Sequence, residues 1–397
     1  MTVLFWGTYV VAGGYPVNRY LIEGLRRSGV VVEECRAEAW GGFVHEALGR
    51  HAAWRLARRA GRCLRAWVRL ARLYRRAGPH DWVVVGYPGY LDVLVLRLLR
   101  AVGRPAAGRR PIALVAFISL HDTVVADRGQ VPCGSWRAGA LRVLDRFAFR
   151  AADLVLADTC QTARHYAASC GLPQERFRRS FVGHEFVGLE GPRAQAPAAG
   201  GDRPGPRVAA GRPWRVLFFG TYVPLHGVEF VLEAAGILRG EEGLEFMLVG
   251  RGPLYPALRK RAEDGGLENV CFVDRWLEAG ELAAQVWQAD VCLGIFGATE
   301  KAARVIPYKV FGALALARPL VTRDSPAARE LLVDGESALL VRPASGEALA
   351  AALLRLRQEP ATAASLAAHG HEVYRRLASP EAVGRDLASA LEGWHGR

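Results

Sequence analysis

The octapeptides VLFWGTYV (residues 3–10) and VLFFGTYV (residues 216–223) are nearly identical, although more than two hundred positions separate them. Each is a run of apolar, β-favouring residues that stops at a glycine and a threonine, and a helix-like stretch follows it. Such a run is typical of a parallel strand that is buried on both faces. The repeat therefore predicts two equivalent strand-to-helix corners, one in each half of the chain.

Strand-like and helical segments alternate around both corners. The first half contains VLFWG, VVVEEC, WVVVGYP, IALVAFIS and DLVLADT, and the second half contains RVLFFGTY, EFMLVGRG, VCFVDRW, VCLGIFG, PLVTRDS and ALLVRP. This alternation predicts the α/β class, with two doubly wound Rossmann-like domains. Because such sheets bind ligands at the carboxyl ends of their strands, we expect the two domains to face one another across a cleft.

The boundary between the halves is marked by GPRAQAPAAGGDRPGPRVAAGRP (residues 191–213), which is too rich in proline, glycine and alanine to carry a core. We therefore expect an N-terminal domain at 1–186, a linker at 187–213 and a C-terminal domain at 214–378. A final helix at 379–397 is expected to pack back on the N-terminal domain.

The composition is that of an ordinary globular protein, with 397 residues, 51% hydrophobic and 23% charged. The apolar runs are shorter than the roughly 20 residues that span a bilayer, and the N-terminus lacks the pattern of a secretory signal. The seven cysteines are scattered without a CxxC pair, which favours reduced structural residues. We expect a cytoplasmic protein.

The net charge of +13 is concentrated in one segment, because ten arginines and no acid lie between Arg50 and Arg76. Arginines recur there every three or four residues opposite an apolar face, which predicts a basic amphipathic helix. Two interpretations stay open, a solvated domain helix and a helix on an anionic membrane surface. Nucleic acid is disfavoured, since no nucleic-acid-binding motif accompanies the helix. The candidate membrane-surface residues are Arg58, Arg62, Arg65, Trp67 and Arg69.

Several common nucleotide and hydrolase signatures are missing. Neither GTYVVAGGYP nor GTYVPLHGVEF supplies the GxGxxG turn of a dinucleotide-binding domain, and no P-loop or GxSxG elbow occurs. The sequence therefore disfavours a dehydrogenase, a P-loop enzyme and a serine hydrolase.

The segment 292–332 combines a strand, a cation-rich loop and a helix that starts near Ile306 with Pro307 in its first turn. Free backbone N–H groups at a helix start, together with nearby cations, form a receptor for a diphosphate. Three further corners, GTYVPLHG (220–227), VGRGP (249–253) and DSPAA (324–328), lie on the same wall. Four such corners favour an anionic nucleotide ligand.

The segment from 216 to 343 resembles the donor-binding domain of the family-4 retaining glycosyltransferases, which have the GT-B fold. The resemblance is carried by LFFGTYVPLHGVEFVLEAA, CLGIFG, KAARVIPYKVFGALALARPLVTRDSPAAREL and DGESALLVRP. The N-terminal half resembles the acceptor domain more loosely, through LFWGTY, GYPVNRYLIEGLRRSGV, FISLHDTVVADRG and RAADLVLADTCQTARHYAASCGLPQERF.

The resemblance implies transfer of a sugar, with retention, from a nucleotide-diphosphate sugar to a lipid-linked or polysaccharide acceptor. This places the reaction in cell-envelope or exopolysaccharide assembly, in the cytoplasm or peripherally on the inner face of the membrane. It implies no metal and no cofactor. A departing nucleoside diphosphate needs positive charge, which Lys309 would supply with Arg304 assisting. His121 and Asp122 would face the transferred sugar.

The remaining site residues follow from the same resemblance and from the predicted corners. The donor-binding residues are Gly220, Thr221, His226, Gly227, Gly250, Gly252, Lys301, Ser325, Pro326 and Glu330. The acceptor-binding residues are Gly7, Thr8, Tyr15, Asn18 and Arg19.

The sequence departs from the family at four positions. Arg304 and Gly312 replace a glutamate pair that usually flanks the donor site, and Thr221 and His226 replace the usual arginine and lysine of the first C-terminal corner. Gly312 has no side chain to accept hydrogen bonds from a ribose. Two alternatives therefore stay open, a catalytically degenerate scaffold that binds a nucleotide sugar and a nucleotide-sugar epimerase of the same fold.

Overall fold

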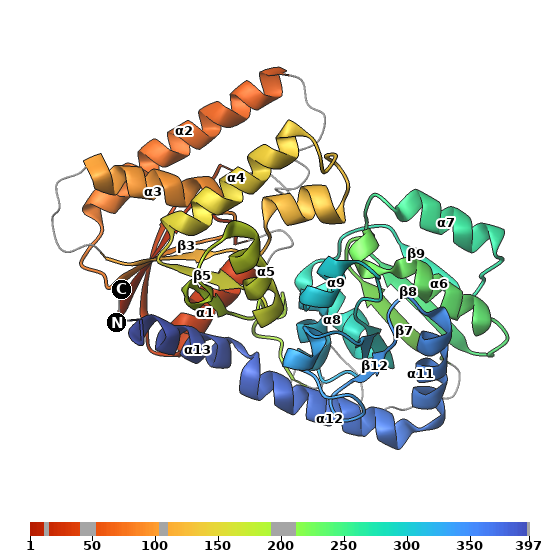
Figure 1. Cartoon of the computed structure of the whole chain (residues 1–397). Helices are drawn as coiled ribbons and strands as arrows, with labels where there is room; N and C mark the ends of the chain where they lie inside the picture. Colours follow the sequence, from red (N-terminus) through yellow and green to blue (C-terminus); the bar gives the residue numbers. More distant parts are fainter. Residues whose placement is uncertain (12–15, 40–52, 103–109, 192–211, 395–397) are drawn as a thin grey trace. The chain divides into compact units, whose positions relative to one another are not determined.

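A computed structural model describes residues 1–11, 16–39, 53–102, 110–191 and 212–394, without the side chains of 53–59. The chain divides into two compact units (Figure 1), called here the N-terminal unit (Met1–Gly183 with Pro380–Arg397) and the C-terminal unit (His184–Ser379). The division after Gly183 lies three residues before the predicted boundary at 186, and most of the predicted linker lies outside the described residues.

The N-terminal unit contains a six-stranded parallel sheet in the order β2-β1-β3-β4-β5-β6. Its strands are β1 (Thr2–Gly7), β2 (Val31–Arg36), β3 (Trp82–Val85), β4 (Ile112–Val115), β5 (Leu154–Ala157) and β6 (Phe177–Arg179). Its helices are α1 (Val17–Arg27), α2 (Ala53–Arg76), α3 (Tyr90–Val102), α4 (Trp136–Ala151), α5 (Cys160–Cys170) and α13 (Pro380–Glu392). Figure 1 shows α2, α3 and α4 on one face of the sheet and α1 with α13 on the other.

The C-terminal unit contains a second six-stranded parallel sheet in the order β12-β11-β10-β7-β8-β9. Its strands are β7 (Trp214–Phe219), β8 (Leu244–Val249), β9 (Val270–Val273), β10 (Val291–Leu293), β11 (Leu320–Arg323) and β12 (Leu339–Val341). Its helices are α6 (Val228–Ile237), α7 (Tyr255–Asp264), α8 (Ala279–Gln288), α9 (Glu300–Arg304), α10 (Tyr308–Ala315), α11 (Gly346–Gln358) and α12 (Pro360–Leu377).

The apolar runs form the cores of both sheets. Val3, Phe5, Val216 and Phe218 have no exposed surface, because helices cover both faces of the strands on which they lie. The two doubly wound α/β units predicted from the sequence are thereby confirmed. β6 was not predicted, since Phe177 is the single apolar residue of this three-residue strand.

The strand order reverses between β1 and β3 in the N-terminal unit and between β7 and β10 in the C-terminal unit. Ligands of doubly wound sheets bind at such switch points, beyond the carboxyl ends of the strands. Gly7 and Gly220 lie at the carboxyl ends of β1 and β7. The two related octapeptides therefore occupy the equivalent corner of each unit.

The described residues contain no helix that is both long and apolar enough to cross a bilayer.

Helix α13 packs directly on α1. A Cβ atom on Gly24 would overlap the carbonyl oxygen of Pro380, and one on Gly384 would overlap the carbonyl of Gly24. Arg27 Nη1 also pairs with Glu381 Oε1 at 2.7 Å. The helices thus meet backbone to backbone, which only glycine permits at these two positions.

We expect Gly384→Ala to force α13 away from α1 and to lower the free energy of unfolding by about 1–3 kcal/mol. Thermal melting and limited proteolysis of the C-terminal segment would measure the change. Gly139→Ala in α4 is the matched control, because a Cβ there meets nothing within 4 Å. Equal stability of the two variants would contradict the close packing.

Candidate functional site

The corners at the carboxyl edge of the C-terminal sheet pack backbone against backbone. Gly220 and Gly250 have φ angles of 137° and 141°, and a Cβ on Gly250 would overlap the Gly220 carbonyl. A Cβ on Gly252 would overlap the backbone of Tyr222, and one on Gly227 would overlap the peptide between Phe296 and Gly297. The four glycines predicted to bind the donor therefore also have a packing role, because no side chain fits between these loops.

Lys309 lies beneath the first of these corners. It has no exposed surface, and its Nζ lies 3.8 Å from the centroid of the Phe218 ring. A Cβ atom on Gly220 would be 2.9 Å from this Nζ, which has no hydrogen-bond partner. Lys309 is the second residue of α10, at the helix start expected from the sequence, and its ammonium is buried at the end of β7, beside the switch point.

The pKa of Lys309 is strongly perturbed. Burial lowers its pKa well below the ordinary lysine value, and the nearby Glu185 carboxylate acts in the opposite direction. Burial raises the pKa of Glu185 to about 7, and its Oε2 is buried without a hydrogen-bond partner. Unsatisfied buried ionisable groups of this kind are concentrated at functional sites.

Phe186 occupies the space beside Gly312. A Cβ atom on Gly312 would lie 2.7 Å from Phe186 Cε2, and Phe186 has no exposed surface. The backbone N–H of Phe186 donates to His184 Nδ1 at 2.9 Å, and His184 Nε2 lies 2.7 Å from Tyr374 Oη. A glutamate at position 312 would therefore not fit, while Glu185 brings a carboxylate to Lys309 from the neighbouring segment.

The predicted cation-rich loop forms a short helix, α9, in which Thr299 Oγ1 accepts the N–H of Ala302. Lys301 is buried and the side chain of Arg304 is 16% exposed. Arg304 Nη1 lies 3.6 Å from Glu300 Oε2.

The other predicted donor residues lie at two corners. His226 is buried and its Nδ1 is hydrogen-bonded to the carbonyl of Thr221. Ser325 Oγ accepts the N–H of Ala328 at 3.0 Å, next to the exposed Pro326 and the partly exposed Glu330.

In the N-terminal unit, Asp92 of α3 organises the corner after β1. Its Oδ2 accepts the backbone N–H of Thr8 at 2.6 Å and the Thr8 hydroxyl at 2.8 Å. A Cβ on Gly7 would be 2.8 Å from the same oxygen. Burial raises the pKa of Asp92, and the hydrogen bonds from Thr8 and Trp67 lower it.

Asn18 joins the corners after β1 and β3. Its Nδ2 donates to the carbonyls of Val10 and Tyr87, and its Oδ1 accepts the N–H of Tyr87 at 2.8 Å. Asn18 is fully buried, so its amide holds the two corners together. Arg19 is exposed, and Tyr15 lies outside the described residues.

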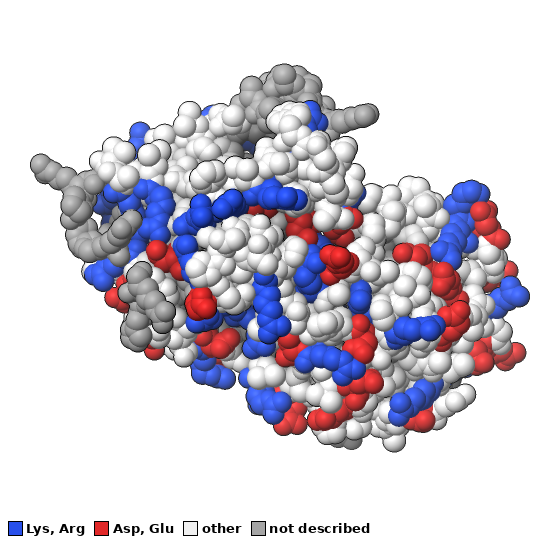
Figure 2. All heavy atoms as spheres, viewed as in Figure 1, with Lys and Arg blue, Asp and Glu red and all other residues white. Residues whose placement is uncertain are grey.

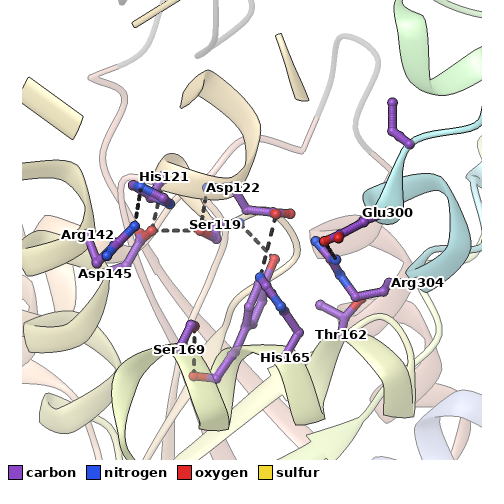
Figure 3. Close-up of polar contacts among 12 residues, drawn as sticks. Ser119, His121, Asp122, Arg142, Asp145, Thr162, His165, Ser169, Glu300 and Arg304 are labelled. Atoms are coloured by element: carbon purple, nitrogen blue, oxygen red, sulfur yellow. Dashed lines mark hydrogen bonds and ion pairs between the residues drawn. The ribbon is translucent and has the colours of Figure 1, made fainter. Parts of the chain in front are cut away.

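The predicted His121–Asp122 pair follows β4, where Asp145 of α4 holds the chain (Figure 3). Asp145 accepts hydrogen bonds from Ser119 Oγ at 2.6 Å and from the N–H groups of Leu120 and His121 at 3.2 and 3.0 Å. Burial raises the pKa of Asp145 to about 6, against the effect of these hydrogen bonds.

Two side chains contact this pair. His121 Nε2 lies 3.3 Å from Arg142 Nη2, and His165 Nε2 lies 3.6 Å from Asp122 Oδ1 (Figure 3). Burial and the Arg142 charge lower the pKa of His121, which favours a neutral imidazole at neutral pH. A neutral imidazole and a carboxylate at a strand end are suited to binding sugar hydroxyl groups.

The arginine-rich segment forms α2, of which the Arg58 side chain is not described. Arg62, Arg65 and Arg69 are exposed, whereas Trp67 Nε1 donates to Asp92 Oδ1 at 2.8 Å. Trp67 therefore anchors α2 on the unit instead of facing outward with the arginines. Basic and acidic side chains are intermixed over the face shown in Figure 2.

Asp92 and Asp145 were not predicted, although helical periodicity gave a signal. In α4, the buried residues Ala138, Asp145, Ala148 and Phe149 form one stripe, which puts an acid at an apolar position. An acid on a buried stripe requires donors from another element.

The two doubly wound α/β units have the architecture of the GT-B fold. Residues 213–359 match the family model for glycosyl transferases group 1. The family resemblance predicted from the sequence is thereby confirmed.

Two relatives and one solved structure show the extent of the similarity. The chain is 26% identical over 280 residues to alpha-D-kanosaminyltransferase of Streptomyces kanamyceticus, covering 68% of this chain and 67% of that protein. It is 32% identical over 165 residues to phosphatidyl-myo-inositol mannosyltransferase of Mycobacterium leprae, covering 41% and 42%. The structure of Anabaena HepE in complex with UDP and glucose superimposes with a TM-score of 0.66 at 14% identity, over 99% of this chain and 100% of that one.

We expect the Lys309→Met variant to differ from the wild type in the pH dependence of stability. Because burial lowers the pKa of Lys309, the unfolded chain binds more protons here than the folded chain, and wild-type stability rises with pH towards about 10. The variant lacks this increase, so its stability relative to the wild type should fall between about pH 8 and 10. Urea unfolding at several pH values measures this difference in the free energy of unfolding.

Lys260→Met is the control, because it removes an exposed lysine of the same unit. The change in the free energy of unfolding caused by Lys309→Met also includes the lost contact with Phe218. The dependence of this free energy on pH is therefore the diagnostic quantity. Identical slopes for the two variants would contradict a perturbed Lys309.

We expect Gly312→Ala to lower the free energy of unfolding by about 1–3 kcal/mol, because the new methyl group collides with the buried Phe186 ring. Combining it with Phe186→Leu should cost less than the sum of the two changes. Gly280→Ala in α8, where a Cβ meets nothing within 4 Å, is the control. Additive effects in urea unfolding would refute the contact.

Proposed function

We propose that the protein is a retaining, metal-independent glycosyltransferase that uses a nucleotide-diphosphate sugar as its donor. The observation that carries this proposal is the buried Lys309 Nζ, which lacks a hydrogen-bond partner at the switch point of the unit that matches the family model. A diphosphate at this corner would supply the missing counter-charge. The leaving nucleoside diphosphate would gain most from Lys309, since its negative charge develops as the glycosidic bond breaks.

The donor class is supported by the complex of HepE with UDP and glucose, a protein of the same fold. In this proposal Arg304 and Lys301 of α9 add positive charge near the same corner. Ser325, Pro326 and Glu330 contribute the corner after β11, and Glu330 would accept hydrogen bonds from donor hydroxyl groups. Glu185 takes over the carboxylate function that Gly312 lacks.

The acceptor is proposed to be a lipid-linked or polysaccharide glycan of cell-envelope or exopolysaccharide assembly, bound at the N-terminal unit. His121 and Asp122 would bind the transferred sugar and the incoming hydroxyl. The corner of Gly7 and Thr8 would bind the acceptor beside Arg19.

A peripheral position at the inner face of the membrane is part of the proposal. Its support is the combination of exposed apolar and basic side chains on the helices of the N-terminal unit. Leu64 and Val68 of α2 are 60% and 45% exposed, and Trp136 and Phe147 of α4 are 78% and 57% exposed. Such a mixture is typical of surfaces that contact anionic lipid.

A catalytically degenerate scaffold is the second candidate, favoured by the missing side chain at Gly312. It differs from the enzyme in one measurable respect, since it would bind a nucleotide sugar without transferring or hydrolysing it. The two proposals therefore separate once binding and product formation are measured on the same preparation.

We expect at least one nucleoside diphosphate to raise the melting temperature of the wild type, because a ligand that binds only the folded state stabilises it. Lys309→Met should lose this shift, and the control Lys260→Met should keep it. With the matching nucleotide sugar and a glycan acceptor, NMR of the product should show the anomeric configuration of the donor, also in the presence of EDTA.

The proposed donor site would be refuted by a nucleotide-induced shift that persists in Lys309→Met. Inversion of the anomeric centre would refute the retaining mechanism alone. Conversion of the free nucleotide sugar without an acceptor would identify the epimerase.

A further inference from the structure

A pocket lined by four arginines lies at the carboxyl end of β2. It has a volume of about 400 Å³, within the range of small-molecule sites, and Arg36, Arg62, Arg65 and Arg69 line it. Glu38 is the one acid among the described lining residues. Since the three arginines of α2 are spaced three and four residues apart, they project from one face of the helix, opposite the end of the strand.

The pocket adjoins the ligand-binding edge of the sheet. Arg36 is in register with Gly7 on the neighbouring strand, and the next residue, Ala37, donates its N–H to the Gly7 carbonyl at 3.3 Å. The strand order reverses on the other side of β1. The pocket is therefore one strand away from the switch point of this unit.

A hydrogen-bonded chain fixes α2 at this edge. Trp67 Nε1 donates to one oxygen of Asp92 at 2.8 Å, and the other oxygen accepts both the N–H and the hydroxyl of Thr8. Ala66, buried on the pocket side of the helix, forms part of the lining. The arginines are thus carried by a helix that is anchored to the acceptor corner.

The arginines are poorly neutralised. Arg36 Nη2 lies 3.8 Å from Glu38 Oε1, but the Glu38 side chain is 85% exposed, so this pair is weak. None of the ion pairs between described residues involves Arg62, Arg65 or Arg69. An anion in the pocket would therefore meet guanidinium groups that still have donors to offer.

The chemistry of the lining favours a phosphate group. Guanidinium groups bind phosphate oxygens through paired, charge-assisted hydrogen bonds. The described lining consists of arginine, alanine and glutamate, without an aromatic ring on which a nucleobase could stack. A compact anion fits this lining better than a nucleotide does.

We propose that this pocket binds a phosphate or diphosphate group of the sugar acceptor, so that the acceptor class is a phosphate-bearing one. The assignment to the acceptor rests on the proposed glycosyltransferase function, whereas anion binding by the pocket does not. The phosphate group belongs either to a soluble acceptor or to a lipid at a membrane surface.

The test is titration of the full-length protein with inorganic pyrophosphate, in the Lys309→Met background so that the donor corner does not contribute. Replacing Arg62, Arg65 and Arg69 together with Gln should weaken binding at least about tenfold, because three charged donors are lost. The matched control replaces Arg72, Arg75 and Arg76, exposed arginines of the same helix that do not line the pocket. Equal weakening in both triple variants, or no weakening in the pocket variant, would overturn the proposal.

Vesicle flotation distinguishes the two sources of phosphate. Phosphatidylcholine vesicles with and without phosphatidylglycerol are compared for the wild type and both triple variants. Retention that requires phosphatidylglycerol and the pocket arginines assigns the phosphate to a membrane lipid. Pyrophosphate binding without vesicle retention assigns it to a soluble acceptor.

The donor site gives an independent readout in a chain that keeps Lys309, because nucleoside diphosphate binding depends on Lys309 and should persist when only the three pocket arginines are replaced. The expected result is therefore loss of pyrophosphate binding in the Lys309→Met background, with an intact nucleotide shift when the same arginines are replaced in the chain that keeps Lys309. A wild type that binds pyrophosphate through the arginines but binds no nucleotide would refute the proposed function and still support anion binding by the pocket. Nucleotide binding without arginine-dependent pyrophosphate binding would refute the pocket and support the proposed function.

Discussion

Direct packing of backbone on backbone at the carboxyl edge of the C-terminal sheet is the constraint on which the candidate site depends. Gly250 lies on the carbonyl of Gly220, and Gly227 lies on the peptide before Gly297. A side chain at any of these positions would separate the loops. Because the loops are this close, the Nζ of Lys309 lies against the backbone of Gly220, where a phosphate approaching the corner would meet it.

The choice of lysine at this position has a physical reason. Lys260, Lys301 and Lys309 are the three lysines of a chain that otherwise uses arginine for positive charge. An arginine keeps its charge at any physiological pH and could not lie unpaired under Gly220 without a large desolvation cost. A lysine can lose its proton when it is buried and regain it when an anion arrives. Burial lowers the pKa of Lys309, which fits this loss and recovery of the proton.

Local sequence patterns predicted the architecture because strands and corners are determined by residues that are adjacent in the sequence. Apolar runs that end in glycine located the strands, and the repeated octapeptide located the equivalent corners. The groups that organise those corners were not predictable in the same way, since their partners are distant in sequence. Asp92 binds Thr8 across 84 positions, and Asn18 binds Tyr87 across 69. Periodicity could at most have shown that Asp145 lies on a buried stripe.

The glycine at position 312, where the family usually has a glutamate, differs from the uncompensated loss of a side chain. A site that loses a large buried side chain without compensation retains a cavity, which destabilises the protein. Here the volume beside Gly312 is filled by the buried Phe186 ring, whose backbone is held by His184. The adjacent Glu185 then brings a buried carboxylate under the influence of Lys309. One short segment thus fills the space with Phe186 and supplies a carboxylate with Glu185. This is the pattern of a repacked site, which favours the enzyme over the scaffold.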